Sequence, residues 1–72
     1  MLQSIEVFKT NIQLPEHAAA VGRMLYISFP TYTTDFDLED CDRVLRVKGS
    51  NILPEQIMNC VRANGFECEI LE

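Results

Sequence analysis

The chain has 72 residues, of which 47% are apolar, and a net charge of −5. This length fits a single domain over residues 1–72, near the lower limit for a chain that folds around its own core. The acidic balance argues against nucleic acid or an anionic membrane surface as a partner, because proteins bind both through Lys and Arg. No run of about eighteen apolar residues is present, so we expect no membrane span.

The first half of the chain predicts a strand, a helix and a second strand. Apolar and polar residues alternate over residues 3–9, which is typical of a half-buried strand. The Leu-Pro-Glu run at residues 14–16 predicts a helix start, because Pro is pre-set for the first helical position. An apolar stripe at helical spacing continues this helix until Pro30 ends it. Alternation then returns over residues 31–38 and predicts the second strand.

The second half repeats the pattern with a hairpin in front of it. An acidic turn at residues 39–42 joins the second strand to a third over residues 43–48. The Leu-Pro-Glu run recurs at residues 53–55 and predicts a second helix. Asn64-Gly65 ends that helix, since Gly accepts the left-handed conformation beyond a helix end. Alternation over residues 66–70 predicts a last strand.

The predicted order is therefore βαββαβ, an α+β arrangement. Each helix has one apolar stripe to bury, so both helices must cover the same face of the sheet. We predict a ferredoxin-like two-layer sandwich, with a four-stranded antiparallel sheet whose first and third strands are central.

Several apolar positions and the Gly-aromatic step into the last strand match a known family in their order and spacing. They are Val21 and Leu25 of the first helix, Leu38, Leu45 and Val47 of the hairpin, Ile57 and Val61 of the second helix, and Asn64-Gly65-Phe66. In these positions the whole chain resembles the heavy-metal-associated, copper-chaperone-like domain. The resemblance implies the same ferredoxin-like fold.

The chain departs from this family at the metal-binding loop. The family carries Met-x-Cys-x-x-Cys between the first strand and first helix, where two thiolates bind soft Cu(I). Residues 10–17 of this chain contain no cysteine. Counting from the helix places Leu14 and His17 at the two thiolate positions, and counting from the strand places Asn11 and Leu14 there. A Cu(I) dithiolate cannot form in either register, so the family function is not carried over to any residue, and no cofactor is expected.

A second set of metal-ligating residues gathers at the same end of the predicted sheet. His17 and Cys41 lie there with the acidic turn, and a His-Cys-carboxylate set suits Zn(II). The alternative is that His17 is a solvated residue of the first helical turn and Cys41 is a simple turn thiol. We do not expect a metal ion among the partners of the chain.

The hairpin and the helix-free face of the sheet form the predicted partner surface. An EF-hand calcium loop is excluded, because counting from Asp35 places Asp40 and Arg46 where Gly and Glu are needed. The acidic residues are therefore either a solvated hairpin edge or a docking face for a basic partner. The partner surface comprises Phe8, Val44, Arg46, Asp35, Asp37, Glu39, Asp40 and Asp42.

The three cysteines are expected to be free thiols in the cytoplasm, because their number is odd and no secretory signal is visible. Cys60 and Cys68 occupy inward positions, where cysteine behaves as a small hydrophobe. The chain contains one His and no Gly-rich phosphate loop, so we do not expect an enzyme. We predict a non-catalytic protein-interaction or self-association module that binds another protein or a second copy. The alternative is a metal-binding or carrier protein with a non-standard site near His17 and Cys41.

Overall fold

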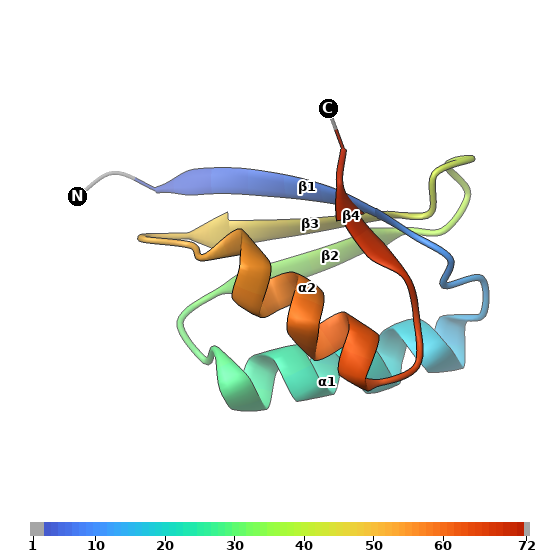
Figure 1. The fold of residues 1–72 in the computed structure, drawn as a ribbon, viewed down its shortest axis with the longest axis horizontal. Helices are drawn as coiled ribbons and strands as arrows, with labels where there is room; N and C mark the ends of the chain where they lie inside the picture. The colour runs from blue at the N-terminus through green and yellow to red at the C-terminus, as the bar shows by residue number, and fades with distance from the viewer. Residues whose placement is uncertain (1–2, 72) are drawn as a thin grey trace.

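The structure, a computed structural model, describes residues 3–71 and has the predicted order of elements (Figure 1). The elements are β1 (Ser4–Thr10), α1 (Pro15–Ser28), β2 (Thr33–Asp37), β3 (Val44–Gly49), α2 (Pro54–Ala63) and β4 (Cys68–Ile70). The strands form one antiparallel sheet in the order β2-β3-β1-β4. Both helices lie on one face of it. The ferredoxin-like βαββαβ sandwich is therefore confirmed.

Both helices begin at the proline of a Leu-Pro-Glu run. Pro15 and Pro54 occupy the first helical position, and no side chain caps either N-terminus. The predicted stripe of α1 is buried at Ala18, Val21 and Leu25. The helix runs to Ser28, as expected. Its last turn includes Tyr26 and Ile27, whose side chains are exposed. Within residues 3–71, neither helix has the length and apolar content needed to cross a membrane.

Phe8 lies in the core, and the prediction that it faces outward is wrong. Its side chain is 0% exposed, whereas Ile5 on the opposite face of β1 is 57% exposed. The register explains this result, because Phe8 is opposite Leu45 of β3, and residues opposite each other share a face of the sheet. Leu45 is also 0% exposed and belongs to the same core.

Three further members of the predicted partner surface are either buried or paired with one another. Val44 lies on the helix-free face but is only 4% exposed, so it offers no contact area. Its neighbours in the sheet are Lys9 and Asp37, and side chains directly opposite one another cover the position between them. Arg46 is paired with Asp35 at 3.0 Å in an exposed ion pair. The outer face therefore carries the ion pairs Arg46–Asp35 and Lys9–Glu69 beside the exposed side chain of Ile5.

Gly49 ends β3 beneath the ring of Tyr32. A Cβ at this position would lie 2.7 Å from Tyr32 Cδ1, closer than such contacts occur. The ring cannot move without cost, because the Tyr32 hydroxyl donates to the Asn51 carbonyl at 3.0 Å. We expect Gly49→Ala to lower the free energy of unfolding by about 1–3 kcal/mol, the usual cost of overpacking.

Urea unfolding measures this cost, with Gly22→Ala as the matched control. Gly22 lies within α1, and a Cβ at this position would meet the Phe36 ring at an ordinary contact distance of 3.7 Å. Alanine there should raise stability by roughly 0.5–1 kcal/mol, since it favours the helix over glycine. Equal effects of the two substitutions would contradict the proposed clash with Tyr32.

Candidate functional site

Three segments that are distant in sequence meet at one end of the sheet. They are the loop between β1 and α1, the turn between β2 and β3, and the connection from α2 to β4 (Figure 1). Thr10 at the end of β1 donates its amide hydrogen to the Asp42 carbonyl at 3.0 Å. The Asn11 side-chain oxygen accepts a hydrogen bond from the Glu67 amide at 2.8 Å. These bonds hold all three segments together, as the topology predicted.

The hairpin turn presents Asp40, Cys41 and Asp42 as a cluster of ligand atoms. One thiol sulfur and two carboxylate oxygens all lie within 4.8 Å of one another. The Asp42 amide donates to the Asp40 carboxylate at 2.9 Å, which orients that carboxylate within the turn. Cys41 is exposed. A thiolate with two carboxylates is a donor set for a borderline divalent ion.

Arg43 fixes the shape of this turn. Its backbone lies in the left-handed region, with φ of 46°. Its guanidinium reaches back and donates to the Leu38 carbonyl at 2.5 Å, while its amide donates to the Asp40 carbonyl at 3.0 Å. The turn is thus closed at both ends by one residue. The sequence does not indicate a left-handed backbone at this position, because that region favours Gly or Asn over Arg.

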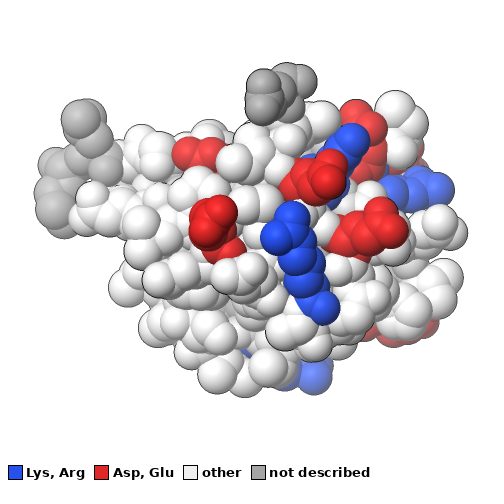
Figure 2. All heavy atoms as spheres, in the orientation of Figure 1, with Lys and Arg blue, Asp and Glu red and all other residues white. Residues whose placement is uncertain are grey.

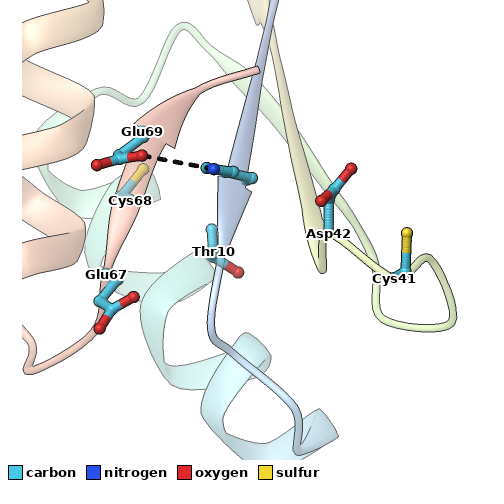
Figure 3. Close-up of a pocket in the computed structure, with 7 residues that line it drawn as sticks. Thr10, Cys41, Asp42, Glu67, Cys68 and Glu69 are labelled. Carbon is cyan, nitrogen blue, oxygen red and sulfur yellow. Dashed lines mark ion pairs between the residues drawn. The ribbon is translucent and has the colours of Figure 1, made fainter. Parts of the chain in front are cut away.

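A pocket of about 250 Å³ lies between the hairpin turn and β4 (Figure 3). In Figure 3, Cys41 and Asp42 come from the turn, Glu67, Cys68 and Glu69 come from β4 and the residue before it, and Thr10 lies between them. Lys9 also lines the pocket and pairs with Glu69 at 3.7 Å. Figure 2 shows acidic and basic side chains gathered over this end of the molecule. Acidic groups predominate in the pocket lining, which favours a cation over an anion.

His17 lies apart from the cluster on the hairpin turn. It is exposed in the first turn of α1, and its ring lies 5.2 Å from that of Phe66, measured between centroids. Among the described residues, the group whose ligand atoms come together is Asp40, Cys41 and Asp42, without His17. A contribution of His17 to metal binding therefore stays a prediction.

The loop that corresponds to the family's metal site has a structural role in this chain. Ile12 is 0% exposed and belongs to the core. Asn11 is engaged with the Glu67 amide, and Leu14 supplies only its carbonyl to the amides of His17 and Ala18. The loop therefore offers apolar packing and backbone bonds in place of thiolates.

The other two cysteines are poor metal ligands at neutral pH. Cys68 is 1% exposed, and burial raises the pKa of its thiol to about 11, against the opposing effect of Arg62. Burial also raises the pKa of Cys60, which a hydrogen bond from Ser28 partly offsets. The thiolate is the form that binds metal, so a raised pKa makes Cys60 and Cys68 weaker ligands. Cys41 is the exposed thiol of the three. The prediction that Cys68 faces inward is confirmed.

The structure is similar to the solution structure of the yeast copper transporter domain Ccc2a, determined in the apo and Cu(I)-loaded states. The TM-score is 0.79 at 17% sequence identity, over 94% of each chain. No family model and no curated protein matches the sequence. The similarity confirms the resemblance to the heavy-metal-associated domain as a resemblance of fold, with a divergent sequence.

This similarity also requires a correction. The prediction of a protein-interaction or self-association module is contradicted, because a protein with this fold is a copper transporter domain. The expectation that no metal ion is bound has no support for the same reason. The alternative of metal binding takes the place of the main prediction.

Proposed function

We propose that the chain is a non-catalytic metal-binding or carrier domain whose ligands lie on the hairpin turn. The observation that carries the proposal is the grouping of Asp40, Cys41 and Asp42, whose ligand atoms lie within 4.8 Å of one another. The fold supports it, since it is shared with a domain solved with Cu(I). Cys41 is the anchor, because its thiol is exposed on the turn.

The donor set favours Zn(II) over Cu(I). Cu(I) prefers soft thiolate ligands, and the cluster supplies one thiol. Zn(II) accepts sulfur, imidazole and carboxylate ligands together and readily keeps water in an open position. The net charge of −5 attracts cations to the whole molecule. The free cysteines fit a cytoplasmic location, where thiols stay reduced.

Titration of the reduced chain with Zn(II), followed through backbone amide shifts, tests the proposal. We expect stoichiometric shifts at residues 40–42. Cys41→Ser should lower Zn(II) affinity by about 100-fold or more, because losing a ligand exceeds the roughly 10- to 100-fold cost of losing an outer partner. Cys60→Ser is the matched control, since that thiol lies on α2 outside the cluster. A parallel titration of His17→Ala measures any contribution of the imidazole.

Two results would contradict the proposal. One is an unchanged amide spectrum of the wild-type chain with both Zn(II) and Cu(I). The other is equal Zn(II) affinity of the Cys41→Ser and Cys60→Ser variants. Saturable Cu(I) binding that exceeds Zn(II) binding would retain a metal-binding function and overturn the choice of ion.

A further inference from the structure

Thr10 occupies the junction between the hairpin turn and the β1–α1 loop. Its hydroxyl donates to the Arg43 carbonyl at 2.7 Å, across a separation of 33 residues. The same oxygen accepts a hydrogen bond from the Ile12 amide at 3.1 Å. One hydroxyl has one hydrogen to donate and lone pairs to accept, so it can satisfy both partners at once.

The backbone of Thr10 adds further bonds to the same turn. Its amide hydrogen is shared between the carbonyls of Asp42 and Arg43, at 3.0 and 3.2 Å. Asp42 belongs to the ligand cluster, so β1 holds the backbone of a ligand residue directly. Because Arg43 has a strained left-handed backbone, the turn keeps this shape only while its neighbours hold it.

The two hydroxyl bonds are in series. They run from the Ile12 amide through the Thr10 oxygen to the Arg43 carbonyl, which follows the ligand cluster along the chain. Hydrogen bonds in such a chain polarise one another, so a displacement at one end alters the strength of the bond at the other. Ile12 is fully buried, so the end of this series of hydrogen bonds that lies in the β1–α1 loop is anchored in the core.

We propose that Thr10 is a positioning residue for the metal site on the hairpin turn, and that its hydroxyl transmits metal binding to the β1–α1 loop. This inference rests on the proposed function, since it concerns the same site. Thr10 contacts no metal in this role. It sets the arrangement of Asp42 and Arg43 around the cluster, and it makes the Ile12 amide responsive to the occupied state.

Thr10→Val and Thr10→Ser separate the hydroxyl from the shape of the side chain. Valine keeps the branched shape but leaves the Ile12 amide and one lone pair of the Arg43 carbonyl without the hydroxyl. We expect Thr10→Val to lower Zn(II) affinity about tenfold, as for lost hydrogen bonds around metal ligands. Thr10→Ser should stay within about twofold of wild type, because the hydroxyl is retained.

The amide of Ile12 supplies a readout that loss of stability alone would not change. In the wild-type chain, this amide should shift with the same Zn(II) midpoint as the amides of residues 40–42. The Ile12 shift should disappear in Thr10→Val and persist in Thr10→Ser. Thr34→Val is the matched control, because Thr34 is half-buried on β2 and pairs with Val47, away from the turn. Its affinity and its Ile12 response should equal those of wild type.

The outcomes distinguish this inference from the proposed function. If wild type binds Zn(II) through Cys41 but its Ile12 amide does not move, the transmission is overturned without any variant. If Thr10→Val binds as tightly as wild type, the positioning role is overturned and the site on the turn stands. If wild type binds no Zn(II), the proposed function fails, and the inference fails with it.

Discussion

Replacing Phe8 by alanine is expected to remove a large part of the stability of this chain. Phe8 is 0% exposed at the centre of the sheet, where it pairs with Leu45 of β3 and Ile70 of β4. Truncating a buried Phe to Ala costs about 3–5 kcal/mol through lost burial and the cavity that remains. At about 0.05–0.15 kcal/mol per residue, a domain of this size has only about 4–11 kcal/mol in total.

Urea unfolding followed by circular dichroism measures the loss. Ile5→Ala is the matched control, because Ile5 lies on the same strand with its side chain on the opposite face, 57% exposed. That substitution should change the free energy of unfolding by about 0.5 kcal/mol or less, as is usual at the surface. A larger effect at Ile5 than at Phe8 would mean that β1 presents its other face to the helices.

The predicted elements followed from signals that act over a few residues. Pro15 and Pro54 fix the backbone angle at the first helical position, and both helices begin there. Gly65 has φ of 93° after α2, which is the left-handed conformation that Asn64-Gly65 predicts. Local chemistry decides such positions, so the sequence alone was sufficient for the order and boundaries of the helices.

The face of β1 could not be decided in the same way. Ile5 and Val7 share one face and Phe8 lies on the other, so alternation yields two apolar sets without saying which is inward. The choice depends on the register with β3, where Phe8 meets Leu45 across 37 positions of sequence. The side of β1 that carries Phe8 is the buried one, because its partner Leu45 in β3 is also 0% exposed, and this pairing cannot be read from β1 alone.

The candidate site shows the same division. The grouping of Asp40, Cys41 and Asp42 follows from their being consecutive in a predicted turn. The role of Thr10 does not, because its hydroxyl partner is the backbone of Arg43, and any residue type has a carbonyl to offer. Backbone partners leave no trace in composition or spacing. The sequence therefore predicts the ligand atoms of this turn better than it predicts what holds them.

Raising the pH from 9 to 11 should destabilise the chain through Cys68. Burial raises the pKa of this thiol from its ordinary value of 9.0 to about 11 in the folded state, with Arg62 opposing the shift and Glu69 adding to it. Well below pH 9 the thiol is protonated in both the folded and the unfolded chain, so its ionisation does not affect the free energy of unfolding. Between pH 9 and 11 only the unfolded chain loses the proton, so stability falls as pH rises, by about 3 kcal/mol in all.

The measurement is the urea midpoint of wild type and Cys68→Ala across pH 7 to 11.5. Other groups also ionise in this range, but they do so in both proteins, and the difference between the two curves isolates Cys68. Cys68→Ala should be less stable than wild type at pH 7, because it leaves a small cavity in the core. The two curves should then approach one another above pH 9, since only wild type loses stability through this thiol. Parallel curves from pH 7 to 11.5 would contradict this prediction. They would mean that the Cys68 thiol ionises as readily in the folded chain as in the unfolded one, and that its burial beneath α2 does not exclude water.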